Sequence, residues 1–146
     1  YSDALMEVSR HYCWLNNQTL EIRTVSGIYL IAMKMIAHRD YRNDISDAIG
    51  ILIEEAEAGN SFSYADIEAA YHKLYHEAPA LKTQEQFREI CVKSVDELKS
   101  LYDSQRNTEA SVGDQLITYI EDGVNINTKN VTDVAARIRE KMSKNQ

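Results

Sequence analysis

The stretch from Ile28 to Ala37, IYLIAMKMIA, decides the fold because it is apolar around the whole circumference of a helix, with the single exception of Lys34. A helix that is apolar on every side is normally buried among other elements. A buried ammonium without a partner is strongly unfavourable, so Lys34 must pair with a carboxylate, extend to water or face a bound anion. We therefore expect a central buried helix whose function depends on the surroundings of this lysine.

A second amphipathic helix is predicted directly after a short polar turn at 40–43. Between Asp44 and Ala58, apolar residues recur at the spacing of one helix face: Ile45, Ala48, Ile49, Leu52 and Ile53. Gly59 and Asn60 then favour a left-handed helix end. Two helices joined by so short a turn are expected to pack against each other, either antiparallel or obliquely.

The rest of the chain also reads as mainly helical. The only convincing strand pattern is the alternation at 19–25, and a single strand needs a partner. Further helices are predicted at 2–12, at 63–78, from 83 through 101, from 111 to just before 123, and from 130 onward. The predicted fold is therefore mainly α, a compact bundle of six or seven helices with one short strand or hairpin near the N-terminus.

Size and composition indicate one helical domain over residues 1–146. We expect a strand-containing segment at 1–58 and a helical bundle extension at 59–146. The chain has 146 residues, 44% hydrophobic and 27% charged, with one proline and five glycines, which suits a globular protein rich in helices. Its net charge of -7 makes nucleic acid an unexpected partner. No apolar run is long enough to span a membrane and no secretory signal is visible, so we expect a cytoplasmic protein.

Residues 14–52 resemble a known family. Four motifs follow one another in the sequence: Trp14-Leu15-Asn16, the segment Leu30 to Ala37 (LIAMKMIA), Arg39, and the segment Asn43 to Asp47 (NDISD). This series is similar to the Trp-Leu-Asn element, the L-x-A-M-K-x-x-A helix, the arginine and the K-D-x-x-D element of nucleotidyltransferase-like proteins of bacterial abortive-infection and toxin–antitoxin systems. In that family a palm with a Gly-Ser element and metal-binding carboxylates precedes this region. The resemblance implies the helical C-terminal portion of such a protein, not catalytically competent by itself.

The same resemblance implies a nucleotide-binding role for Lys34, Arg39, Asp44 and Asp47. A lysine on a rigid helix suits a phosphate, and an arginine adds a planar fork of donors. The two aspartates, at i and i+3, share a helix face and can orient the lysine. In a second interpretation, one aspartate pairs with Lys34 or Arg39 and ties the two helices together. We predict no catalytic residue, metal ligand or cofactor within the chain, and a nucleotide with Mg²⁺ only together with a preceding half.

An alternative function comes from a different class of protein. The chain is then a noncatalytic, all-helical interaction module that binds a protein partner or forms a homodimer. This interpretation predicts that the apolar stripes of the last three helices are not all used internally. His72 and His76 have the i, i+4 spacing of a metal-ligand pair, but the sequence offers no further ligand, so a solvated helix face is favoured.

Overall fold

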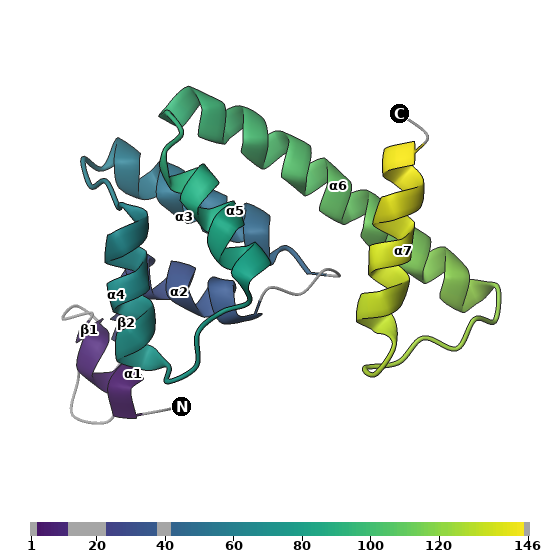
Figure 1. The fold of residues 1–146 in the computed structure, drawn as a ribbon, viewed down its shortest axis with the longest axis horizontal. Helices are drawn as coiled ribbons and strands as arrows, with labels where there is room; N and C mark the ends of the chain where they lie inside the picture. Colours follow the sequence, from purple (N-terminus) through teal and green to yellow (C-terminus); the bar gives the residue numbers. More distant parts are fainter. Residues whose placement is uncertain (1–2, 12–22, 38–41, 145–146) are drawn as a thin grey trace.

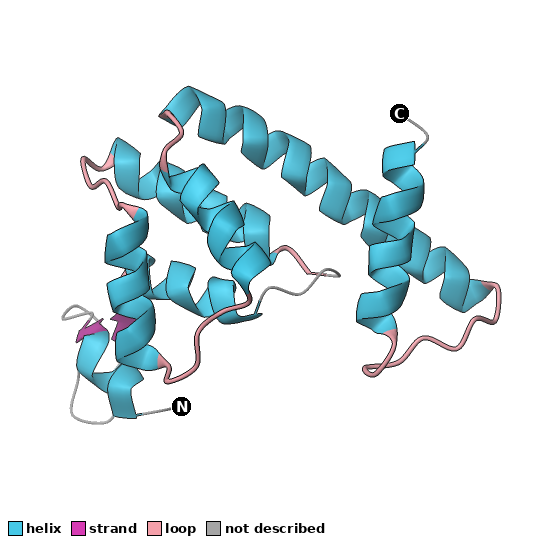
Figure 2. Cartoon of the chain, in the orientation of Figure 1, coloured by secondary structure: helices cyan, strands magenta, loops and turns pink. Residues whose placement is uncertain are grey.

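The computed structural model describes residues 3–11, 23–37 and 42–144, and these ranges are mainly helical, as predicted (Figures 1 and 2). They contain seven helices and two short strands. In chain order these are α1 (Asp3–Val8), β1 (Ser9–His11), β2 (Arg23–Val25), α2 (Gly27–Ala37), α3 (Asp44–Glu57), α4 (Tyr64–Leu74), α5 (Leu81–Cys91), α6 (Val95–Glu121) and α7 (Val131–Lys144).

Helix α2 is buried on more than one side, as its apolar circumference predicts. Ile31 and Met35 lie in the main hydrophobic core, which α2 shares with α3, α4, α5 and the first part of α6. Ala32 faces a second cluster, formed with Ala70 and Tyr71 of α4. The central element predicted from the sequence is therefore confirmed, and α3 and α4 cover two of its sides.

Helix α3 ends as its glycine predicts. The backbone N–H of Gly59 donates to the carbonyl of Ala56, and the N–H of Asn60 donates to the carbonyl of Glu55. This pair of hydrogen bonds requires the left-handed conformation of Gly59, whose φ is 86°. The turn brings the chain back, so that α4 packs against α2.

The N-terminal strands correct one prediction and complete another. The helix predicted at 2–12 ends at Val8, because residues 9–11 pair antiparallel with residues 23–25. Backbone pairing with a distant strand overrides the helical pattern there. The strand predicted at 19–25 is present at 23–25, and its earlier residues lie outside the described ranges. The partner that the strand required is thus the antiparallel strand at 9–11.

Helix α4 begins at the predicted capping box and ends earlier than predicted. The side chain of Asp66 accepts the backbone N–H of Ser63 at 2.8 Å, and the side chain of Ser63 accepts from the backbone of Asp66. The helix stops at Leu74 instead of continuing to 78, because Tyr75 is extended and the hydroxyl of Tyr71 donates to the backbone carbonyl of Glu77. The residues that follow Leu74 are therefore not on a helix.

The boundary between α5 and α6 differs from the predicted one. The sequence pattern carried one helix from Thr83 past Ser94, but α5 ends at Cys91 and α6 begins after Ser94. Ser94 and Glu97 form a reciprocal capping box, in which the backbone N–H of Ser94 donates to the side chain of Glu97 at 2.8 Å. Thr83, the predicted cap, is instead a buried residue within α5.

Helix α6 also passes through the predicted start at Ser111. It runs for 27 residues, and the hydroxyl of Ser111 donates to the carbonyl of Asn107 at 2.9 Å, one turn earlier. A serine within a helix commonly makes this bond, so Ser111 with Asp114 imitates a capping box without being one. Residues 95–121 thus lie on one continuous helix, whereas the prediction divided them between a helix that runs through 101 and another that starts at 111.

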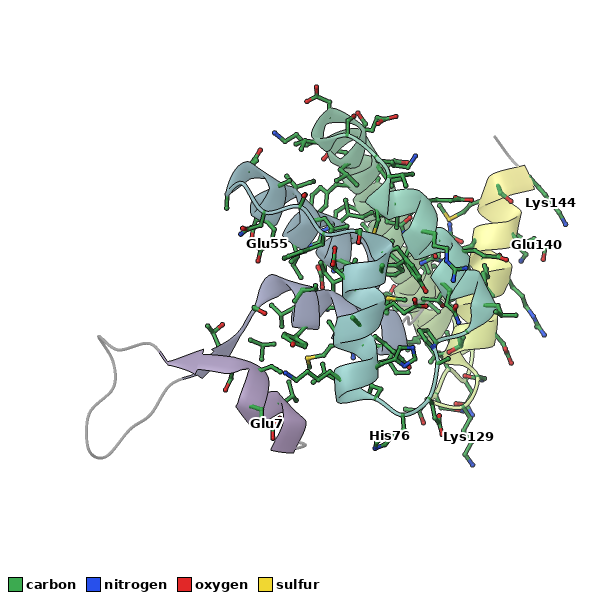
Figure 3. The ribbon with its side chains drawn as sticks, turned by 60° about the vertical axis from the view of Figure 1, so that its left-hand side comes forward. Glu7, Glu55, His76, Lys129, Glu140 and Lys144 are labelled. Atoms are coloured by element: carbon green, nitrogen blue, oxygen red, sulfur yellow. The ribbon has the colours of Figure 1, made fainter. Side chains whose placement is uncertain are left out.

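The second half of α6 packs against α7, and the two helices together form a separate hydrophobic cluster. Val112 and Leu116 pack against Ala135 and Ile138 of α7. Figure 1 shows α7 beside this half of α6 and away from α2 to α5, and Figure 3 shows Glu140 and Lys144 on its outward side. We call residues 110–144 the arm.

Some large apolar side chains of α5 and α6 are exposed to solvent. In the arm, Ile117 is 56% exposed and Ile120 is 55% exposed. At the start of α5, Leu81 is 74% exposed. Among the described residues, no helix combines the length and the apolar character that crossing a bilayer requires.

Two serine substitutions test the revised start of α6. Ser94→Ala removes the cap and is expected to lower the free energy of unfolding by about 1 kcal/mol. Ser111→Ala is the matched control, and it should leave stability unchanged or raise it slightly because alanine favours helix interiors. Urea denaturation followed by circular dichroism measures both. A larger loss for Ser111→Ala would restore the predicted boundary.

Candidate functional site at the junction of α2, α3 and α6

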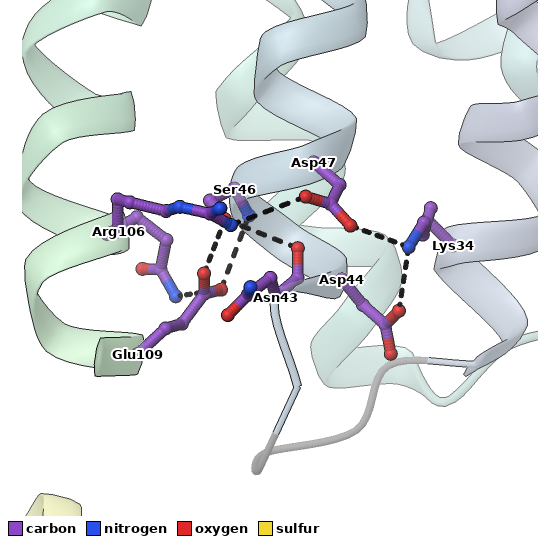
Figure 4. Close-up of polar contacts among 8 residues, drawn as sticks. Lys34, Asn43, Asp44, Ser46, Asp47, Arg106 and Glu109 are labelled. Atoms are coloured by element: carbon purple, nitrogen blue, oxygen red, sulfur yellow. Dashed lines mark hydrogen bonds and ion pairs between the residues drawn. The ribbon is translucent and has the colours of Figure 1, made fainter. Parts of the chain in front are cut away.

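The ammonium of Lys34 is held between two aspartates from the first turn of α3. Its Nζ lies 3.2 Å from Oδ1 of Asp44 and 2.7 Å from Oδ2 of Asp47 (Figure 4). Asp44 is buried, with 1% of its side chain exposed, whereas the side chains of Lys34 and Asp47 are 31% and 39% exposed. The start of α3 also favours these carboxylates through the helix dipole. The lysine therefore links the buried interior to the solvent.

The surroundings of Lys34 raise its pKa above the ordinary value of 10.5. Burial lowers this pKa, but the hydrogen bonds and charges of Asp47 and Asp44 raise it by more. The lysine is consequently protonated at neutral pH. An ammonium has three N–H donors, and the two aspartates are its only acceptors within the described ranges, which leaves one donor for water or a ligand.

Asp47 bridges two cations that come from different helices. Its Oδ2 accepts from Lys34 of α2, and its Oδ1 lies 3.5 Å from Nη1 of Arg106 of α6. All three side chains reach solvent, since that of Arg106 is 45% exposed. An ammonium and a guanidinium that share one accessible carboxylate form an arrangement that also suits a phosphate.

A buried polar cluster continues from this bridge into the interior. Glu109 of α6 is almost fully buried, and its carboxylate accepts from the hydroxyl and, at 3.3 Å, from the backbone N–H of Ser46. The amide of Gln105 donates to the same carboxylate at 3.0 Å. Arg106 also donates to the hydroxyl of Ser46 at 3.4 Å, which joins the two parts of the network. These bonds hold the position of α6 against the start of α3.

The structure brings together three of the four residues predicted to form a site. Lys34, Asp44 and Asp47 meet although they lie on two helices. Arg39 lies outside the described residues. The interpretation that an aspartate pairs with Lys34 and ties the helices together matches these contacts.

The sequence reasoning missed the members of the network that α6 supplies, and it assigned no role to Ser46. Glu109 lies at i−3 and i−7 from Val112 and Leu116, so it is a charged residue on an apolar stripe, which is the signal that identified Lys34. The predicted helix start at Ser111 interrupted this stripe. Had one continuous helix been predicted here, Glu109 would have been recognised as a carboxylate on the buried face that needs hydrogen-bond donors.

The other candidate sites do not assemble in the described part of the chain. His76 follows the end of α4 and points away from the molecule in Figure 3, so it does not share a helix face with His72. No group of three or more histidine, cysteine, aspartate or glutamate residues there could hold a metal ion. Burial raises the pKa of the Cys91 thiol to about 11, so this thiol stays protonated at neutral pH.

Comparisons with known proteins do not assign the chain to a family. No family model, no curated protein and no solved structure matches it. The resemblance of residues 14–52 to nucleotidyltransferase-like proteins therefore rests on the motif residues themselves.

A comparison of two lysines tests the structural role of the Lys34 pair. Lys34→Met is expected to lower the free energy of unfolding by about 1–3 kcal/mol, because the buried Asp44 then loses its ammonium. Lys99→Met is the matched control, because Lys99 pairs with Glu57 at 2.6 Å on the exposed surface and such pairs contribute little. Equal effects in chemical denaturation would contradict a specific role for Lys34.

The raised pKa of Lys34 also predicts a dependence on pH. The folded-state pKa exceeds 10.5, so the stability that Lys34 contributes is complete below the unfolded-state value and is lost as the pH rises through the folded-state value. The difference in unfolding free energy between the parent and Lys34→Met should therefore be constant at neutral pH and shrink above about pH 10.5. A difference that stays constant in alkali would contradict this assignment. Denaturant titrations at a series of pH values measure it.

Proposed function

We propose that the chain is the helical, noncatalytic portion of a nucleotidyltransferase-like protein and that Lys34 and Arg106 contact the phosphates of a nucleotide. The observation that carries the proposal is the exposed carboxylate of Asp47 between these two cations. In the proposed complex, a phosphate oxygen takes the bridging place of Asp47. Asp44, which is buried against Lys34, keeps the ammonium in position during this exchange.

Two features support the assignment to this class. The motif residues Lys34, Asp44 and Asp47, quoted above for the family resemblance, converge on one point of the fold. The ammonium that they hold also retains one donor for a ligand. The chain supplies binding and orientation in this proposal, and the metal ions needed for nucleotidyl transfer belong to carboxylates of a preceding palm.

Titration with a Mg²⁺-bound nucleoside triphosphate tests the proposed contacts. The parent chain should bind, and Lys34→Met and Arg106→Met should each weaken binding by about tenfold or more, since each removes a charged donor to phosphate. Asp47→Asn should strengthen binding because it removes the competing anion. Lys99→Met is the control for charge alone and should bind like the parent. Isothermal titration calorimetry measures these affinities.

The Asp47→Asn variant separates binding from stability. A purely structural role for the Lys34 cluster predicts that this variant loses stability and gains no affinity for the nucleotide. Absence of binding by the parent, or equal binding by all variants, would contradict the proposal. The coding sequence gives a second test, because a Gly-Ser element followed by paired carboxylates ahead of Tyr1 is required of the whole protein.

A further inference from the structure

Each of the two cations in the candidate site has a buried anchor of its own. Lys34 is anchored by Asp44, whose side chain is 1% exposed. Arg106 is anchored by Ser46, which is fully buried, and Nη1 of the guanidinium donates to the Ser46 hydroxyl at 3.4 Å (Figure 4). Asp47, which both cations share, is the accessible carboxylate of the cluster. If Asp47 moves away, each cation therefore keeps one fixed contact.

The anchor of Arg106 is itself held by Glu109 of α6. The buried Glu109 carboxylate accepts the backbone N–H of Ser46 at 3.3 Å and also accepts the Ser46 hydroxyl. A hydroxyl has one hydrogen, so donation to Glu109 leaves the lone pairs of the oxygen for the guanidinium. The carbonyl of Asn43, at 3.3 Å, is the more distant acceptor for the same hydrogen. Ser46 thus holds the guanidinium in place although it does not reach solvent itself.

The spacing of the two anchored cations suits one phosphate group. Nζ of Lys34 lies 2.7 Å from one oxygen of the Asp47 carboxylate, and Nη1 of Arg106 lies 3.5 Å from the other. Two oxygens of one phosphate group are bonded to a single central atom, as are those of a carboxylate, so the same pair of cations can bind either group. The anchors keep this spacing when the carboxylate is replaced.

A longer phosphate chain gains little at this cluster. The displaced carboxylate of Asp47 remains attached to α3 beside the cations, and it repels any further phosphate. The net charge of -7 gives a more negative ligand no general advantage either. The affinity should therefore depend on the first phosphate and only weakly on the number of phosphates.

We propose that the site binds a single phosphate group, as found in a phosphate monoester, and that Ser46 and Glu109 position Arg106 for it. This inference rests on the proposed function and specifies which part of the nucleotide is recognised. The phosphate bridges the ammonium of Lys34 and the guanidinium of Arg106. Ser46 and Glu109 act on the ligand only through Arg106, because both are buried.

Titration of the full chain with adenosine mono-, di- and triphosphate, without metal ions, tests the single phosphate. The three dissociation constants should agree within about threefold, and adenosine itself should bind at least about tenfold more weakly. Isothermal titration calorimetry measures these affinities. A monophosphate that binds about tenfold or more weakly than the triphosphate would overturn the inference and leave the nucleotide proposal intact.

Inorganic phosphate separates this inference from the proposed function. It should displace the monophosphate, but with lower affinity, since it lacks the nucleoside. Inorganic phosphate that binds as tightly as the nucleotides would support the single-phosphate site and contradict the nucleotide proposal. If neither the nucleotides nor inorganic phosphate bind, both proposals fail.

Two losses of a buried hydroxyl test the positioning role of Ser46. Ser46→Ala removes the oxygen that Arg106 contacts, and it should weaken binding of the monophosphate by about threefold to tenfold. Thr83→Val is the matched control, because Thr83 is a buried residue of α5 outside the site, and this variant should bind like the parent. Circular dichroism shows whether both variants are folded. An equal loss of affinity in both variants would contradict the positioning role.

A double-variant comparison separates positioning from general destabilisation. In the Arg106→Met background, Ser46→Ala should change the affinity for the monophosphate by less than about twofold, because its effect passes through Arg106. Glu109→Gln provides an independent variant at the same network, and it should weaken binding only when Arg106 is present. Losses of the same size in both backgrounds would overturn the positioning role.

Discussion

The fold depends on one constraint, which is the pairing of Lys34 on the central helix α2 with the two aspartates at the start of α3. Helix α2 can occupy the centre of the bundle only if Lys34 has partners, and Asp44 and Asp47 provide them from the first turn of α3. That requirement fixes the rotation of α3 about its axis. The apolar face of α3 then points at Ile31 and Met35, which completes the core.

The same requirement extends to α6. Ser46 lies between the two aspartates, and its buried donors need an acceptor, which Glu109 supplies. A polar network that is fully hydrogen-bonded specifies one arrangement of helices more sharply than apolar contacts do, because any shift leaves a buried group without a partner. The network therefore fixes the register of α6 on α3. Tyr102 reinforces it by packing close to Gly50, where an added side chain would approach the ring to 3.3 Å.

The sequence predicted most of the helices and the Lys34 pair because both depend on local patterns. Residues 28–37 can be recognised from their apolar circumference, and Asp44 and Asp47 from their spacing one turn apart. The errors arose where two local signals competed. Ser94 and Ser111 each precede an acidic residue by three positions, and only tertiary packing decides that the first begins a helix while the second lies inside one. Strand pairing at 9–11 is a long-range event, and the network from Ser46 to Glu109 joins positions 63 residues apart.

The length of α6 has a consequence for how the protein unfolds. Its first half packs in the main core, and its second half packs in the cluster with α7. One continuous helix therefore belongs to two hydrophobic clusters. The α7 unit is the smaller, and its loss would expose few residues of the main core. Such a unit opens as a separate cooperative block, with a lower free energy than global unfolding. Backbone amides of α7 should accordingly exchange with solvent sooner than those of α2.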